Sequence, residues 1–173
     1  MTIIFKGIVF RAHKPRRSIS PTSGEGARFH GGRFNPKGVA ALYTSLEEST
    51  AFAEHQQGFL HRPQPMTLCA YEVECADILD LTDSANRKSY KIRPSDLACP
   101  WEDLIDRKIT PPSWEISQRL MNADVAGIIV PSYAKNAPKK GRNLVFWRWG
   151  ETNPHRVTVI DDEYRLPKNK DAW

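Results

Sequence analysis

The pattern of apolar and polar positions predicts several β-strands. Residues 67–75 alternate, with Cys69, Tyr71, Val73 and Cys75 on one side of the chain and polar or small residues between them, which is typical of a half-buried strand. Residues 125–130 form a continuous apolar run, as expected for a central strand covered on both faces. Further strands are expected at residues 3–10, 39–44, 78–81, 143–149 and 156–160.

Fewer segments have a helical pattern. A helix is expected over residues 46–60, because Ser45-Leu46-Glu47-Glu48 fits a capping box in which the Ser45 hydroxyl accepts from the N–H of Glu48. Shorter helices are expected at residues 113–121 and around Trp101. Strands and helices do not alternate regularly, so we expect an α+β fold with a mainly antiparallel sheet. A chain of 173 residues fits one domain, spanning residues 1–173.

The densest group of turn-forming residues surrounds a single arginine. Gly31, Gly32, Pro36 and Gly38 bring the backbone into tight turns on both sides of Arg33. The expected order is a loop, a short strand and a helix that carries Glu54. This arrangement predicts a ligand site around the Arg33 guanidinium.

Charge and cysteine content limit the classes of partner. The formal charge of +5 and the pI of about 9.2 favour an anionic partner, although the basic groups at residues 14–17, 135–142 and 168–170 fit solvated loops equally well. Three cysteines without Cys-x-x-Cys spacing are expected to be buried thiols. No group of His, Cys or Asp residues has metal-ligand spacing, so no metal is expected. Without a long apolar segment, we expect a cytoplasmic protein that does not enter a membrane.

Four polar residues at element ends are the candidates for chemistry: Arg33, Tyr43, Glu54 and Ser132. Each also has an ordinary structural interpretation, as an ion-pair partner, a core residue, a solvated helix position and a loop cap. Taken alone, Arg33 favours function, Tyr43 and Ser132 favour structure, and Glu54 is evenly balanced. A dinucleotide fingerprint at Gly24-Glu25-Gly26 is rejected, because Phe29 replaces the third glycine and no helical pattern follows.

Four segments together change that balance. Gly-Gly-Arg-Phe-Asn-Pro-x-Gly from residue 31, Leu-Tyr-Thr-Ser from residue 42, Ala-Phe-Ala-Glu from residue 51 and Val-Pro-Ser from residue 130 resemble the RES family, over residues 10–149. The family is named for an Arg, a Glu and a Ser, which match Arg33, Glu54 and Ser132. Tyr43 matches the aromatic residue of its strand and Arg11 an early arginine. Phe34 and Ala12 depart from the residues expected beside Arg33 and Arg11.

The resemblance implies a fold, an activity and a partner. RES proteins are the toxins of bacterial toxin–antitoxin pairs, have a fold similar to ADP-ribosyltransferases and act on NAD. The chain is therefore expected to cleave the nicotinamide–ribose bond of NAD, to inhibit growth and to be neutralised by an Xre-like helix-turn-helix antitoxin, which itself makes any DNA contact. The expected catalytic residues are Arg33, Glu54 and Ser132, and the residues expected to bind NAD are Arg11, Arg33, Asn35 and Tyr43.

The chemistry of NAD cleavage fits these residue types. Nicotinamide leaves as a neutral molecule from a cationic one, so no acid is needed to protonate it, in contrast to ordinary glycosides. Glu54 would offset the positive charge that grows on the ribose, and Arg33 would hold the pyrophosphate. Tyr43 would stack on nicotinamide, and the resemblance assigns Ser132 to orienting the ribose or Glu54. Water, phosphate and a protein side chain all remain open as the acceptor.

Two other classes of function compete with this hypothesis. A basic nucleic-acid-binding protein or RNA-cleaving toxin would use residues 14–17 and 135–142 on phosphates, with Trp147 and Trp149 as stacking platforms. No RNA-binding signature accompanies them, so this hypothesis ranks second. A module that only holds a nucleotide differs from the enzyme in whether Glu54 affects turnover or binding alone.

Overall fold

The computed structural model describes residues 1–57 and 62–169. Its strands are β1 (Ile3–His13), β2 (Leu42–Ser45), β3 (Thr67–Asp80), β4 (Gly127–Pro131), β5 (Arg142–Phe146) and β6 (His155–Val159). Its helices are the 3-10 turn η1 (Pro15–Arg17) and α1 (Glu25–His30), α2 (Glu48–Gln56), α3 (Ser84–Ser89), α4 (Pro94–Leu97), α5 (Trp101–Asp106) and α6 (Pro112–Asn122). The strands expected from the sequence are confirmed, with shifted ends.

Five of the strands are joined in a closed circuit of pairings. The long strands β1 and β3 pair along most of their length, β1 also meets β2 at Phe10 and Ser45, β2 pairs with β5, β5 with β4, and β4 returns to β3. Strand β6 is added to β3 outside this circuit. Among the described strands only β3 and β4 pair in parallel, so the expected α+β fold with a mainly antiparallel sheet is confirmed.

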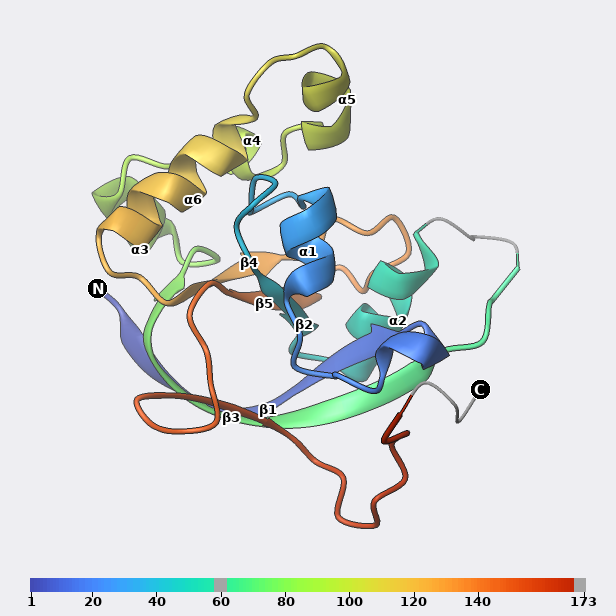
Figure 1. The fold of residues 1–173 in the computed structure, drawn as a ribbon. Coiled ribbons are helices and arrows are strands. Elements are labelled where there is room, and N and C mark those ends of the chain that lie inside the picture. The colour runs from blue at the N-terminus through green and yellow to red at the C-terminus, as the bar shows by residue number, and fades with distance from the viewer. Residues whose placement is uncertain (58–61, 170–173) are drawn as a thin grey trace.

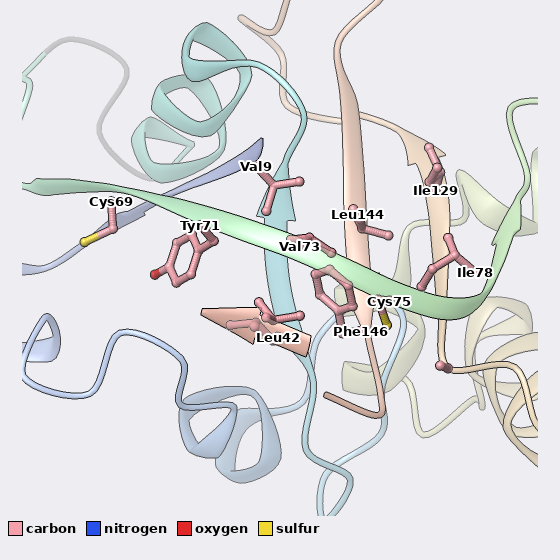
Figure 2. Close-up of a cluster of buried hydrophobic side chains, with 12 residues drawn as sticks. Val9, Leu42, Cys69, Tyr71, Val73, Cys75, Ile78, Ile129, Leu144 and Phe146 are labelled. Carbon is pink, nitrogen blue, oxygen red and sulfur yellow. The ribbon is translucent and has the colours of Figure 1, made fainter. Parts of the chain in front are cut away.

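The main core lies inside this circuit (Figure 2). Val9 of β1, Leu42 of β2, Tyr71 of β3 and Leu144 of β5 are fully buried there and belong to one apolar cluster. The alternation predicted for residues 67–75 of β3 is confirmed, since buried and more exposed residues alternate from Cys69 to Cys75. This is the pattern of a strand, in which successive side chains point to opposite faces. Burial of apolar surface on this scale is the main stabilising contribution to such a fold.

A second core lies between β4, β5 and the helices. Helices α3 to α6 gather on one side of the molecule, away from the long strands β1 and β3 (Figure 1). Ile116 and Leu120, four residues apart on α6, pack in one cluster with Ile128 of β4 and Val145 of β5. Strand β5 therefore lies between two apolar layers, with Leu144 and Phe146 in the first cluster and Val145 in the second.

Three local predictions were wrong. A helix, α1, does follow Gly24, although it is short and contains a glycine. Ser45 does not cap α2, because it is the last residue of β2 and its hydroxyl donates to Asn143; the helix begins three residues later. Arg11 lies within β1 and not at its end. The part of the predicted helix at residues 58–60 falls outside the described residues.

The remaining sequence predictions concern cysteines, metals and membranes. Cys69, Cys75 and Cys99 are free and buried, as predicted. In residues 1–57 and 62–169, no group of three or more His, Cys, Asp or Glu residues is placed to hold a metal ion. The helices in this described part of the chain are too short or too polar to cross a membrane.

Candidate active site

The loop that carries Arg33 is fixed through its carbonyl groups. The carbonyl of Gly32 accepts from the indole of Trp114 at 2.7 Å, that of Arg33 from the Ser113 hydroxyl at 2.6 Å, and that of Phe34 from the indole of Trp147 at 2.9 Å. Backbone groups that secondary structure leaves without partners are thus satisfied by side chains from α6 and from the end of β5. The loop is held in one position on the second core.

This loop directs the Arg33 guanidinium into the site without neutralising it. Its NH1 donates to the carbonyl of Cys99 at 2.5 Å and more weakly to that of Leu97 at 3.4 Å. Its central carbon lies 4.6 Å from the centre of the Tyr133 ring, within the range of a cation–π contact. Within the described chain, no carboxylate forms an ion pair with Arg33, so its charge is available to an anion.

Glu54 is held by donors from three elements. Its Oε1 accepts from the Ser132 hydroxyl and from the Asn143 amide, each at 2.6 Å, while its Oε2 accepts from the amide of Gln57. Ser132 directly follows β4, and Asn143 is the second residue of β5. These donors fix the orientation of the Glu54 carboxylate. The Ser132 hydroxyl thus contacts Glu54 directly, which fits one of the two roles that the resemblance leaves open for it, and the role itself stays a prediction.

Tyr43 and Asn35 brace the site from behind. The Tyr43 hydroxyl donates to Oδ1 of Asn35 at 2.7 Å and accepts from the N–H of Phe34 at 2.9 Å. Burial raises the pKa of Tyr43 well above its ordinary value. The Asn35 side chain is 0% exposed, and its amide donates to the carbonyls of Ala27 and Val39. A direct contact of Asn35 with a ligand, as expected from the sequence, is therefore corrected to a supporting role.

Arg11 connects the site to the segment that follows β1. Its NH1 donates to the carbonyls of Pro21 and Ser23 at 3.3 and 3.1 Å, and burial lowers the pKa of the guanidinium. Between these two carbonyls, that of Thr22 accepts from the indole of Trp149 at 2.9 Å. Like Arg33, Arg11 thus has neutral oxygen partners, and among the described residues its second terminal nitrogen has no hydrogen-bond acceptor.

These residues surround a cavity with two lobes. One lobe, of about 350 Å³, is lined by β1, β2 and α2, including His55; the other, of about 430 Å³, extends over the Arg33 loop to Trp101 and Tyr133. Of the residues that the structure describes, four line both lobes: Arg11, Tyr43, Glu54 and Asn143. Two unneutralised arginines beside an ordered carboxylate suit a ligand that carries phosphate groups and a polar group close to them.

Sequence reasoning missed part of this site. Asn143 has no glycine or proline beside it, and nothing local distinguishes it from other polar residues at the start of a strand. Tyr133 directly follows Ser132, so an aromatic residue after the serine was a usable signal. Trp147 and Trp149 are half-buried, pack against the cores and donate their N–H groups to loop carbonyls, which removes them as stacking platforms for nucleic acid.

Fold and site together define an α+β protein in which two arginines and a positioned carboxylate line one cavity. The chain belongs to the RES domain family, whose model matches residues 8–169. It is similar in fold to a chain of the Mycobacterium tuberculosis MbcT–MbcA toxin–antitoxin complex, with a TM-score of 0.70 and 20% identity over 92% of this chain and 84% of that one. No curated protein sequence matches the chain significantly.

Proposed function

We propose that this protein is the toxin of a toxin–antitoxin pair and that it cleaves the bond between nicotinamide and ribose in NAD. The observation that carries the proposal is the Glu54 carboxylate, fixed by Ser132 and Asn143 in a cavity with two arginines that have no carboxylate partner in the described chain. Membership of the RES family and the fold shared with a toxin–antitoxin complex support it.

The residues of the cavity fit NAD. Arg11 and Arg33 supply guanidinium groups for the two phosphates, and neutral carbonyl partners leave both charges free for them. Tyr133, beneath Arg33, and Trp101 add aromatic surface to the same lobe. The hydroxyl of Tyr43 is engaged with Asn35 and Phe34, so Tyr43 would offer its ring and not its hydroxyl to a ligand.

In the proposed reaction, the bond between C1′ of the ribose and the nicotinamide nitrogen breaks. Its electron pair leaves with the nitrogen, so nicotinamide departs neutral and the positive charge passes to the sugar. Glu54 stabilises that charge, because its carboxylate is ordered before the substrate arrives. The acceptor then forms the new bond to C1′ and gives up its proton. Water, phosphate and a protein side chain satisfy this balance equally.

The test is to incubate the purified protein with NAD, with and without phosphate, and to separate the products by chromatography. We expect nicotinamide to be released together with one second product, which identifies the acceptor. That product is ADP-ribose if the acceptor is water, ADP-ribose 1-phosphate if it is phosphate, and modified protein if it is a protein side chain. Folded protein that releases no nicotinamide under any of these conditions would overturn the proposed activity. Growth that is unaffected by expression of the chain alone would overturn the toxin assignment.

A further inference from the structure

Three neighbouring strands deliver polar side chains to the same place beside Glu54. Ser45 of β2 is the direct cross-strand partner of Asn143 in β5, and Asn143 is in turn paired with Val130 of β4. Ser132 lies two residues beyond Val130, so its hydroxyl reaches the same carboxylate oxygen as Asn143. The register of the strands thus brings the side chains together.

The orientation of the Asn143 amide is determined by its two partners. Its Oδ1 accepts from the Ser45 hydroxyl at 2.8 Å, and this leaves the NH₂ group to donate to Oε1 of Glu54 at 2.6 Å. Ser45 is 3% exposed, so water does not compete for its hydroxyl. A chain of two hydrogen bonds therefore runs from β2 through β5 to the carboxylate on α2.

The residue before Asn143 fastens the start of the same helix. Glu47, at the N-terminus of α2, accepts from the backbone N–H of Arg142 at 3.1 Å and forms an ion pair of 3.3 Å with its guanidinium. Strand β5 thus contacts α2 at its first turn and again at Glu54. These two contacts hold α2 at a fixed distance from β5, the strand whose residue Asn143 lines the cavity.

We infer that Asn143 is a positioning residue for Glu54, a role that rests on the proposed function. Ser132 and Asn143 together occupy Oε1 and so present Oε2 to the ribose. Among the contacts of the described chain, the partner of Oε2 is the amide of Gln57, which lies on an exposed residue of the same cavity. Substrate replaces that amide, whereas the two donors on Oε1 stay in place through turnover.

Steady-state kinetics of NAD cleavage test this inference. Asn143→Ala should lower kcat roughly 10- to 100-fold, the weight of one hydrogen bond to a charged group, and leave KM nearly unchanged. Ser45→Ala should lower kcat less, because the amide remains but is no longer held in one orientation. Asn136→Ala, on an exposed residue beyond β4, is the matched control. Wild-type kcat in Asn143→Ala would overturn the positioning role while leaving the proposed function intact.

Asn143→Asp provides a readout that a merely structural residue would not give. It places a second carboxylate against Glu54, so activity should fall further than in Asn143→Ala near neutral pH and recover partly at lower pH, where the two share a proton. Arg11, Arg33, Tyr43, His55 and Glu102 also face the cavity and are unchanged between the variants. An activity profile parallel to that of Asn143→Ala at every pH would count against the inference.

A measurement without NAD separates this inference from the proposed function. If the wild-type protein releases no nicotinamide, the activity fails, and urea unfolding of Asn143→Ala, Glu54→Ala and the double variant still tests the contact, because each substitution removes one of its two partners. We expect the two substitutions to be non-additive by roughly three- to tenfold in the unfolding equilibrium constant. Simple additivity would overturn the inference by itself.

Discussion

The hydroxyl of Ser132 and the carboxylate of Glu54 are 78 positions apart in the sequence and 2.6 Å apart in the structure. The contact joins the end of β4 to the last turn of α2, across the start of β5. Because Ser132 directly follows β4 and Asn143 lies in β5, two strands of the closed circuit hold the donors that orient the carboxylate.

Glu54→Gln should keep the fold and lose most of the NAD turnover. The amide preserves the shape of the side chain but removes the charge that stabilises the developing sugar cation, which typically costs on the order of 10²–10³ in rate. Nicotinamide release is the measurement, and Glu48→Gln, on the exposed side of the same helix, is the control. Near wild-type turnover in Glu54→Gln would make Glu54 an ordinary surface carboxylate.

Arg33→Ala should weaken NAD binding by about 10- to 100-fold, since charge-assisted hydrogen bonds to phosphate are lost. Arg33→Lys should recover only part of that affinity, because a lysine keeps the charge without the planar fork. Calorimetric titration in the Glu54→Gln background measures binding without turnover. Arg107→Ala, an exposed arginine paired with Asp103, serves for comparison. Equal affinity in Arg33→Ala and Arg107→Ala would contradict the assignment.

Gly32→Ala should destabilise the protein by about 1–3 kcal/mol through overpacking. A Cβ at this position would lie 2.5 Å from the Tyr43 hydroxyl and 2.8 Å from Oδ1 of Asn35, so the bracing behind the site would have to shift. Gly26→Ala is the opposite case, because nothing lies within 4 Å of its Cβ and the residue is in α1. That variant should gain about 0.5–1 kcal/mol. Urea unfolding of both variants checks the contrast.

The free energy of unfolding should decrease as the pH is lowered, because of His13. Burial, aided by the charge of Arg11, lowers the pKa of His13 to about 3, and its Nε2 lies 2.6 Å from the Tyr71 hydroxyl. The unfolded chain binds a proton below pH ~6.5 while the native His13 stays neutral, so stability is lost as pH falls from there towards 3. Between pH 7 and 5 this amounts to ~2 kcal/mol.

Carboxylates also make stability depend on pH, but they are the same in the wild-type protein and in the variants. A comparison of these proteins therefore isolates the contribution of His13. Urea unfolding at pH 7 and pH 5 should show a smaller pH effect in His13→Gln than in the wild-type protein. His30→Gln, on an exposed residue, should behave as wild type. The same pH effect in all three proteins would exclude His13 as its source.

We expect an antitoxin partner to block the cavity. An acidic side chain of the partner placed on Arg33 or Arg11 would imitate the phosphates of NAD, and both arginines have only neutral partners in the described chain. Co-expression with an antitoxin of the expected helix-turn-helix type should give a stable complex with little NAD turnover. A complex that forms yet cleaves NAD at the rate of the free protein would contradict occlusion of the site.

The parts of the site that lie in local motifs were predictable. Arg33 is surrounded by turn-forming residues, so the local sequence is enough to indicate it. Tyr43, Glu54 and Ser132 are indicated by the resemblance of their segments to the RES family and not by their local sequence alone. Asn143 was not predictable, because its function depends on the register of β2, β5 and β4, which is set by contacts between distant segments.

The errors have a physical reason in common. Ser45 fits a helix cap in sequence, but pairing with β5 gives its hydroxyl a different partner. Asn35 fits a ligand contact in the motif, but the turn buries it beneath Tyr43. In both cases, tertiary contacts decided between two hydrogen-bonding roles that the local sequence allows equally.

The closed circuit of strands has a consequence for how the molecule selects its ligand. A sheet with a free edge on each side can spread to accept a larger guest, whereas a ring of hydrogen-bonded strands widens only if one of its ladders breaks. Phe10 and Ser45, where β1 meets β2, complete that ring beside the cavity. We therefore expect the wall that β1 and β2 form to keep its shape when a ligand binds, and groups too large for the lobe beside Phe10 and Ser45 to be excluded from it.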